Sequence, residues 1–525
     1  MSDRSVLIAL LALVTVVAMG AVLDVMQVDA AQYAAMSREM LHGSDWGHLH
    51  HRGQDYLDKP PLLFWLSALS YKVFGVHAWS YRLPSMLFAF IGLYATHRFA
   101  RLFHPEAVAR TAALMYGSCA AFILMNGDVK TDTMLTASAI TATWLGMAWV
   151  QGRRMVHLAG CAVAIALGML AKGPMGLMAP AIAIGGHVLW ARRFDVLRRR
   201  ELLLAPAIVG LLLLPMAMGL YDQHGAHGLR FFFWEQSFGR ITGENRWKDD
   251  STVLFFTHEV IWQLLPWTLF TLLGLWQGAV ALVKRRPLPE HASWAGAVLV
   301  TVALSFSQFK LPHYLYVVVP LYAVLAARAW HAAPAPAWRR AHGVLVALLW
   351  TLAMVVTAWS FPQGAWPFVA LLVVAGLAAV LHLRRGGGAF AATFTVMIAA
   401  MVALNGHIYP SILRYQANAQ AGKWAAAQGL GPDRFIGFRQ GGTALDFYAG
   451  HPVRWYGDAE EVKAAVRPGT AVYTTPEHAH ELSGAGLEPR RTLHLDNYPV
   501  QLLSLDFLHP GMRENVLEKR VVLVY

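Results

Sequence analysis

The chain is poor in charge and has almost no cysteine. Of its 525 residues, 14% are charged and 56% are hydrophobic, and the mean hydropathy is +0.42. A soluble globular protein carries about 25% charged residues, so this composition predicts a membrane protein with many spans. The two cysteines, Cys119 and Cys161, lie inside apolar runs. They provide neither a disulfide framework nor the spacing of a zinc site, and we expect them to be packing residues.

Hydropathy predicts about thirteen membrane crossings of roughly 20 residues each, with the N-terminus in the cytoplasm. Every predicted cytoplasmic loop is then basic, as the positive-inside rule requires. The net charge of +12 is therefore explained by topology, and we expect no nucleic-acid partner. The predicted spans lie near residues 5–25, 80–99, 107–125, 134–150, 157–175, 176–191, 202–221, 255–283, 293–308, 313–329, 341–360, 365–383 and 389–408.

An odd number of crossings leaves the C-terminus outside, where the composition changes. Residues 1–409 are the predicted transmembrane domain, and residues 410–525, with shorter apolar runs, predict a small soluble α/β domain. The fold class is thus an α-helical polytopic membrane protein with a C-terminal α/β domain. Within that domain we expect helices at Ala417–Ala427 and Ala459–Ala465 and strands at Ala471–Thr474 and Arg520–Tyr525.

The first predicted outer loop runs from Val28 to about His77 and is crowded with polar and aromatic residues. Its residues Tyr33, Met36 and Met40 recur at helical spacing, which predicts a helix lying along the membrane surface.

Two charged residues of this loop are candidates for function. Asp29 closely follows a span, where a carboxylate is costly unless it faces water or a partner. Lys59 precedes two prolines at the level of the lipid phosphates, and its ammonium is a good partner for a phosphate. Each residue also has a simpler explanation. Asp29, and equally Asp132, could be an ordinary helix N-cap, and Lys59 could be a lysine whose ammonium extends to the lipid headgroups.

Two more outer loops add polar residues. The short one, residues 126–132, ends at Asp132. The longer one, from about Tyr221 to Thr252, contains Arg240 and Arg246, enough for a cover over a substrate. His48, His50 and His51 form a tight group in the first loop, but spacing alone does not show that they meet around a metal. Such histidines are more often solvated or hydrogen-bonded.

These loops resemble, in order and position, those of the bacterial PMT/ArnT-like glycosyltransferases. The similarity covers roughly residues 5–330, and its five motifs all fall on the predicted outer face. The motifs are Asp29 with Tyr33 and Glu39-Met40-Leu41, Tyr56-Leu57-Asp58-Lys59-Pro60-Pro61, Asp132 with Leu135-Thr136, Phe238-Gly239-Arg240-Ile241-Thr242-Gly243, and Lys310-Leu311-Pro312-His313-Tyr314.

The resemblance implies the GT-C fold and roles for individual residues. Asp29 matches the essential aspartate of the first loop, and Lys59 matches the lysine that holds the lipid phosphate. Asp58 stands where the aminoarabinose enzymes have a glutamate implicated in metal binding, so a divalent metal is expected at Asp58 and His258, and no organic cofactor. The Arg246-Trp247-Lys248 run departs from the family pattern and leaves metal use and the acceptor open.

The function so implied is transfer of a sugar from a polyprenyl (undecaprenyl) phosphate donor to a lipid A-like glycolipid or a protein. The enzyme would lie in the bacterial inner membrane among membrane lipids, with its active site and C-terminal domain in the periplasm. Asp29 and Asp132 are the expected catalytic residues. The expected substrate-binding residues are Lys59, Tyr56, Tyr33, Arg240, Arg246, Lys310 and Tyr314.

Three alternatives stay open at this point: an enzyme like the protein O-mannosyltransferases, a lipid or solute transporter, and a membrane anchor for the C-terminal domain. A transporter would show paired halves and polar residues near the bilayer midplane. Here the ionisable residues collect at one membrane face, which favours an enzyme.

Overall fold

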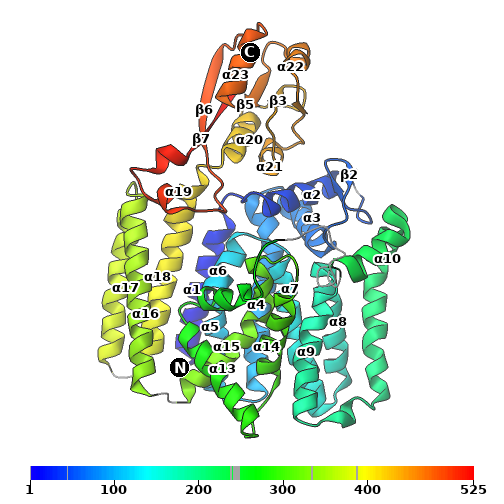
Figure 1. Cartoon of the computed structure of the whole chain (residues 1–525), viewed down its shortest axis with the longest axis vertical. Helices are drawn as coiled ribbons and strands as arrows, with labels where there is room; N and C mark the ends of the chain where they lie inside the picture. Colours follow the sequence, from blue (N-terminus) through cyan, green and yellow to red (C-terminus); the bar gives the residue numbers. More distant parts are fainter. Residues whose placement is uncertain (1, 44, 237–238, 240–248, 333–334, 386–387) are drawn as a thin grey trace.

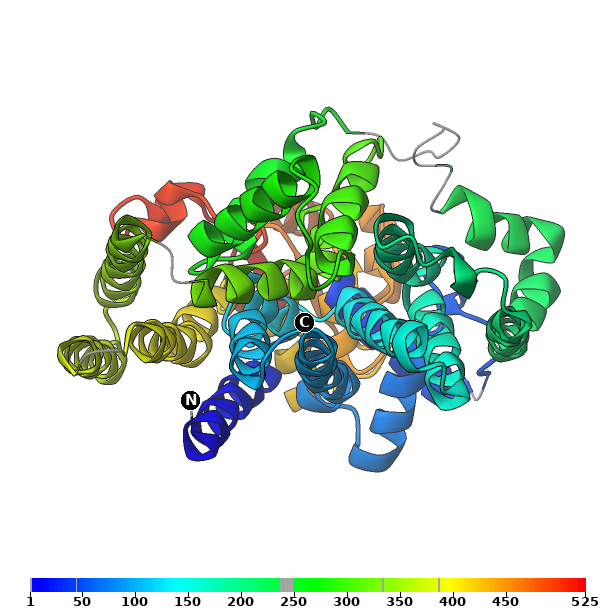
Figure 2. The same ribbon diagram turned by 90° about the horizontal axis from the view of Figure 1, so that it is seen from below.

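The structure is a computed structural model that describes residues 2–43, 45–236, 239, 249–332, 335–385 and 388–525. A bundle of helices carries a small α/β domain at the end opposite the N-terminus (Figure 1). The bundle helices are α1 (Asp3–Ala21), α4 (Ala78–Arg101), α5 (Glu106–Gly117), α6 (Ala120–Gly127), α7 (Asp132–Gly152), α8 (Met155–Lys172), α9 (Met175–Trp190), α10 (Leu204–Arg230), α12 (Phe255–Gln263), α13 (Thr268–Val283), α14 (Ala292–Ser305), α15 (Val319–His331), α16 (Pro336–Val355), α17 (Trp366–Arg384), α18 (Ala389–Ala403) and α19 (Tyr409–Leu413). Seen from below, α16–α18 stand at one side of the bundle and α8–α10 at the other (Figure 2).

The chain is a multi-pass membrane protein. Among the described residues, six helices are long and apolar enough to span a membrane, or seven if the bent pair of α5 and α6 counts as one. Each predicted span falls on a helix or on a broken helix. Because α9, α13 and α14 are shorter than a full span, the total number of crossings stays a prediction.

Two of the predicted spans are each divided into two helices. The span predicted at 255–283 is divided into α12 and α13, because Pro266 between them has no N–H group and cannot continue a helix. The span predicted at 107–125 is divided into α5 and α6, which are bent by 47°. At this bend the Ala120 N–H donates to the carbonyl of Leu265. The two breaks therefore lie together, and the carbonyl at one break accepts a hydrogen bond from the N–H group at the other.

The predicted outer loop contains two helices rather than one. Helix α2 (Asp29–Gly43) is the predicted surface helix, and α3 (Leu62–Phe74) is an apolar helix that the sequence analysis left in the loop. Both lie across the end of the bundle, below the α/β domain (Figure 1). A two-stranded hairpin, β1 (His50–His51) and β2 (Gln54–Asp55), connects them. This layer places the polar residues of the first loop directly above the bundle.

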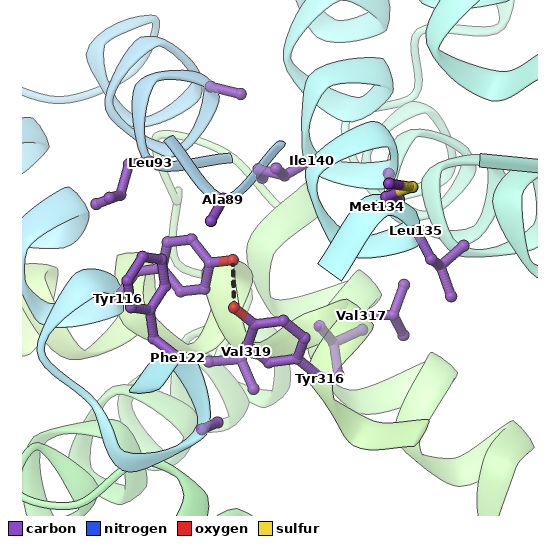
Figure 3. Close-up of a cluster of buried hydrophobic side chains, with 14 of the residues drawn as sticks. Ala89, Leu93, Tyr116, Phe122, Met134, Leu135, Ile140, Tyr316, Val317 and Val319 are labelled. Carbon is purple, nitrogen blue, oxygen red and sulfur yellow. Dashed lines mark hydrogen bonds between the residues drawn. The ribbon is translucent and has the colours of Figure 1, made fainter. Parts of the chain in front are cut away.

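The bundle core beneath this layer is closely packed. Tyr116 of α5 and Tyr316 of the 3-10 helix Pro312–Val318 join their hydroxyls at 2.9 Å, among side chains from α4 and α7 (Figure 3). Both tyrosines are fully buried, so their mutual hydrogen bond satisfies groups that water cannot reach. This contact fixes the segment that carries Tyr314 against α5.

The C-terminal domain has a five-stranded sheet in the order β4-β3-β5-β7-β6. Strands β3, β4 and β5 are parallel, and β7 runs antiparallel between β5 and β6. Alternate residues of β3 pack on opposite faces, Phe435 toward α20 and α21 and Ile436 toward α22 and α23. The predicted helices and strands of this domain are confirmed. The elements are α20 (Ala417–Ala427), β3 (Phe435–Phe438), α21 (Thr443–Ala449), β4 (Trp455–Tyr456), α22 (Ala459–Ala465), β5 (Ala471–Thr474), α23 (Pro476–Gly484), β6 (Arg491–Asn497), α24 (Leu505–Leu508) and β7 (Glu518–Val524).

Two arginines join this domain to the first-loop layer. Arg38 of α2 is buried and donates to the carbonyls of Asp446 and Phe447 at 3.0 and 2.9 Å. Arg52, in the hairpin turn, lies 3.3 Å from the Asp446 carboxylate and donates to the Val453 carbonyl at 2.6 Å. Because these bonds fix α2 to α21, the C-terminal domain holds the first-loop layer in place.

Arg38→Met tests this attachment, since it keeps apolar volume but removes both hydrogen bonds to buried carbonyls. We expect the free energy of unfolding to fall by about 1–3 kcal/mol. A lower melting temperature of the detergent-purified protein and faster proteolysis near residue 413 would report the loss. Arg491→Met, at an exposed position on β6, is the matched control. Equal melting temperatures for the two variants would contradict the proposed attachment.

Candidate active site

A cavity at the end of the bundle below α2 has one polar side and one apolar side. The polar side is formed by the start of α2, the turn before α3, the connection from α6 to α7, the end of α8 and the 3-10 helix before α15. Its residues are Asp29, Tyr33, Lys59, Lys130, Thr131, Asp132, Lys172, Gln236, His313 and Tyr314. The apolar side comes mainly from α9 and α14, with Met175, Met178, Ile182, Val300, Ala303 and Leu304. Asp29 and Lys59 thus line the same cavity, as expected from the sequence.

Each lysine of this cavity lies beside an aspartate. Lys59 contacts Asp58, its neighbour in the chain, and Lys172 contacts Asp132, which begins α7. Lys172 also lies over the ring of Tyr314, at 4.3 Å from its centroid. Only 3% of the Asp132 side chain is exposed, so this carboxylate is held in place by its cation rather than by water.

Lys130 forms the third pair, in the connection between α6 and α7. Its ammonium lies 3.1 Å from Asp128 and 3.9 Å from Asp29. Burial disfavours the charge on Lys130, but Asp128 and Asp29 outweigh it and raise the pKa of the ammonium. Lys130 therefore stays cationic at neutral pH beside Asp29.

Asp29 is the most accessible carboxylate of the cavity. Its side chain is 40% exposed, and it is the first residue of α2, where the helix dipole favours negative charge. A carboxylate with open access to a cavity can accept a proton from a bound hydroxyl group. Asp132, by contrast, is enclosed between Lys172 and His313, whose Nε2 lies 3.8 Å from its carboxylate.

Two tyrosines support the wall near Lys59. The rings of Tyr33 and Tyr56 both stand edge-on to Phe64 of α3, with centroids at 5.6 and 6.3 Å. Burial, followed by the neighbouring tyrosine and carboxylates, raises the pKa of Tyr33, and burial likewise raises the pKa of Tyr56. Both hydroxyls therefore keep their protons at neutral pH. Tyr33 lines the cavity and can donate a hydrogen bond to an anion there, whereas Tyr56, predicted to bind substrate, lies outside the cavity lining in a small pocket beside Lys59.

Several predicted residues lie elsewhere. Lys310 is buried outside the cavity lining, and its ammonium donates to the Ser251 carbonyl at 3.1 Å. Arg240 and Arg246 lie outside the described residues. The ring of His258 is 60% exposed and its Nε2 lies 3.1 Å from Glu259. A metal at Asp58 and His258 stays a prediction, because neither residue belongs to the one metal-competent group of three found in the described part of the chain.

Among the charged and amide side chains of the lining, sequence reasoning missed Lys130, Lys172 and Gln236. Lys130 follows the outer end of the span predicted at 107–125, and Lys172 lies within the outer end of the span predicted at 157–175. The positive-inside rule makes basic residues uncommon on that face, and that signal could have identified them. Gln236, which donates to the Asp58 carbonyl, gave no such signal, because its partner lies far away in the chain.

Comparisons with known proteins agree with this geometry. The family model described as dolichyl-phosphate-mannose-protein mannosyltransferase matches residues 58–218. ArnT from Cupriavidus metallidurans, in a crystal structure bound to undecaprenyl phosphate, superposes with a TM-score of 0.76 at 21% identity, over 99% of this chain and 98% of that one. This chain has the ArnT fold. The resemblance read from its loops is thereby confirmed.

Curated sequences with arabinosyl transferase names also match. The undecaprenyl phosphate-alpha-4-amino-4-deoxy-L-arabinose arabinosyl transferase of Pseudomonas savastanoi is 28% identical over 55% of this chain and 54% of its own. That of Pseudomonas aeruginosa is 28% identical over 55% of this chain and 52% of its own. The chain spans about half the length of these relatives in the alignments, so their activity is carried over only as a proposal.

Two variants test whether the Lys172–Asp132 ion pair stabilises the fold. Lys172→Met leaves the Asp132 carboxylate buried without its ammonium partner, and we expect a loss of about 3–5 kcal/mol in the free energy of unfolding. The double variant Lys172→Met/Asp132→Asn removes the charge as well and should recover most of that loss. Thermal unfolding of the unmodified protein and of these two variants in one detergent measures the difference. A double variant no more stable than Lys172→Met would contradict this pairing.

Proposed function

We propose that this chain is an integral membrane glycosyltransferase that moves a sugar from a polyprenyl phosphate to an acceptor at the outer membrane face. The observation that carries the proposal is that Asp29 and Lys59 line one cavity, to which α9 and α14 contribute apolar side chains. A phosphate on a hydrocarbon chain needs that combination: cations for its head and apolar surface for its tail.

The cavity's residues suggest a division of work in an inverting displacement. The acceptor hydroxyl attacks the anomeric carbon, the bond from that carbon to the phosphate oxygen breaks, and the phosphate leaves with the bonding pair. Lys59, with Lys130 and Lys172 nearby, stabilises the charge that develops on the leaving phosphate. Asp29 takes the proton of the attacking hydroxyl.

The sugar and acceptor are proposed from the relatives. Their name points to 4-amino-4-deoxy-L-arabinose on undecaprenyl phosphate, and the structural neighbour holds undecaprenyl phosphate. We therefore propose aminoarabinose as the first sugar to test and a lipid A-like glycolipid as acceptor. The match to the protein mannosyltransferase model supports a protein acceptor as the second candidate.

We further propose that the cavity and the C-terminal domain face the periplasm and that the protein lies in the inner membrane. The ion pair of Arg110 with Asp3, at 2.7 Å, joins a predicted cytoplasmic loop to the N-terminal end. That end is opposite the C-terminal domain (Figure 1). An excess of basic loops at the N-terminal end favours a cytoplasmic position for it.

Asp29→Asn tests the proposed role of Asp29 as the general base. Because the amide cannot accept the proton, we expect transfer from a synthetic undecaprenyl-phosphate aminoarabinose to lipid A to fall by about 10²–10⁴-fold. Mass spectrometry of the lipid product measures the rate. Binding of undecaprenyl phosphate should persist, since the cations are intact. Asp433→Asn, at an exposed position in the C-terminal domain, is the control. A folded Asp29→Asn enzyme with full activity would remove this role.

Lys59→Met tests the phosphate site. We expect the dissociation constant for undecaprenyl phosphate, measured by tryptophan fluorescence in detergent, to rise at least about tenfold, the equivalent of about 1.4 kcal/mol. Lys72→Met, at an exposed position on α3 a few turns away, should bind like the unmodified protein. If Lys59→Met and Lys72→Met bind equally well, Lys59 does not hold the phosphate.

A further inference from the structure

A second group of chemically active side chains lies outside the cavity, where the first loop meets α10. Asp45, His48 and His50 each offer one ligand atom, and these atoms all lie within 4.8 Å of one another. They line a separate small pocket between the hairpin and α2, together with Glu39. Glu39 is already engaged, since its carboxylate accepts from the N–H groups of Arg52 and Gly53 at 2.9 and 2.6 Å.

The distances within this group fit a metal ion. Asp45 Oδ2 lies 2.9 Å from His48 Nδ1 and 3.5 Å from His50 Nε2, so one carboxylate oxygen faces two imidazole nitrogens. Tetrahedral ligands about 2.0–2.1 Å from a zinc ion lie about 3.3 Å from each other. A small adjustment would therefore place a zinc ion between the three atoms.

The carboxylate is already oriented for this task by its own backbone. Asp45 Oδ1 accepts from the N–H groups of Gly47 and His48 at 3.1 and 3.2 Å. This local turn leaves the other oxygen, Oδ2, directed at the histidines.

Each histidine also has a second carboxylate behind it. Asp222 Oδ2 of α10 lies 2.9 Å from His48 Nε2, and Asp55 Oδ1 of β2 lies 3.4 Å from His50 Nδ1. The His50 nitrogen is buried and lies near Asp55 but makes no hydrogen bond within the described residues, so of the two histidines only His48 has its second nitrogen hydrogen-bonded to a carboxylate. Histidines that bind a metal almost always donate their other ring N–H to a carboxylate or carbonyl. Histidines that only form hydrogen bonds with each other or with Asp45 would not need a carboxylate at the second ring nitrogen of each.

The group lies at a junction that other contacts already make. The side chain of Gln223 on α10 bonds both backbone groups of Leu49, at 3.3 and 2.9 Å, and donates to Asp55 at 2.8 Å. A Cβ on Gly219 would come within 2.1 Å of the Gly47 carbonyl, so α10 and the loop approach as closely as two backbones can. The hairpin is followed directly in the chain by Tyr56, Asp58 and Lys59.

We propose that Asp45, His48 and His50 bind a zinc ion that fixes the first-loop hairpin to the loop before it, which His48 joins to α10 through Asp222. Two imidazoles and one carboxylate are ligands that zinc accepts, with a water in the fourth position, whereas calcium and magnesium prefer oxygen ligands throughout. This site is distinct from the metal predicted at Asp58 and His258. By ordering the hairpin it positions Lys59 without touching the substrate, and its existence does not depend on the proposed reaction.

The test measures metal content on the full-length protein in detergent. After treatment with a chelator and dialysis against Zn²⁺, mass spectrometry of the metal should find one zinc ion less per chain in Asp45→Asn and His50→Gln than in the unmodified protein. His51→Gln is the matched control, because His51 is the next residue on the same strand and bonds Gln32 instead, at 3.3 Å. Zinc should also raise the melting temperature of the unmodified protein and of His51→Gln, but not of His50→Gln.

Three results would overturn the proposal: no zinc bound by the unmodified protein, equal zinc in His50→Gln and His51→Gln, or a zinc ion lost only in Asp58→Asn. If His50→Gln fails to fold, absorption spectroscopy after addition of Co²⁺ replaces it as the test. A visible band typical of tetrahedral Co²⁺ in the unmodified protein, missing in Asp45→Asn, would support the site. The absence of that band from the unmodified protein would reject it. None of these readouts uses transferase activity, so the two proposals fail separately.

Discussion

The cost of placing charge beside a lipid chain is the constraint on which the candidate site depends. Lys59, Lys130 and Lys172 surround one cavity, and each ammonium has a carboxylate beside it. Without those partners, three cations next to the apolar wall of α9 and α14 would be desolvated at a large cost. With them, the cavity keeps three ammonium groups beside apolar side chains. The same pairs leave Asp29 as the most open of its acids.

The layer above the bundle gives this cavity its roof and ties it to the rest of the chain. Asp29 begins α2, Lys59 precedes α3, and the hairpin between these helices contacts α10 on one side and the C-terminal domain on the other. The C-terminal domain thus contributes no described side chain to the cavity lining, yet it fixes the helix that carries Asp29 through Arg38. The position of Asp29 in the cavity therefore depends on the attachment of α2 to the C-terminal domain.

Much of the fold could be predicted from the sequence, because a lipid phase demands apolar runs and basic cytoplasmic loops. Helix Ala417–Ala427 and strand Ala471–Thr474 were predicted to the residue, since their patterns are local. Asp29 and Lys59 were also predicted, from the loop motifs. The charged partners of the site residues could not be predicted. Lys172 contacts Asp132, 40 residues away in the chain, and His48 contacts Asp222, 174 residues away, and such pairs form only when the helices pack. Lys310, predicted to bind substrate, is instead held by the Ser251 carbonyl.

Photo-crosslinking tests the central claim, that one cavity receives a polyprenyl phosphate, most directly. A polyprenyl phosphate with a diazirine in its first isoprene unit would be irradiated with the protein in nanodiscs, and the labelled peptides identified by mass spectrometry. The account predicts labels on residues 172–182 and 300–314, which line the cavity, and their loss on competition with undecaprenyl phosphate. Labels confined to the apolar groove between α16, α17 and α18, around Trp350, would contradict it.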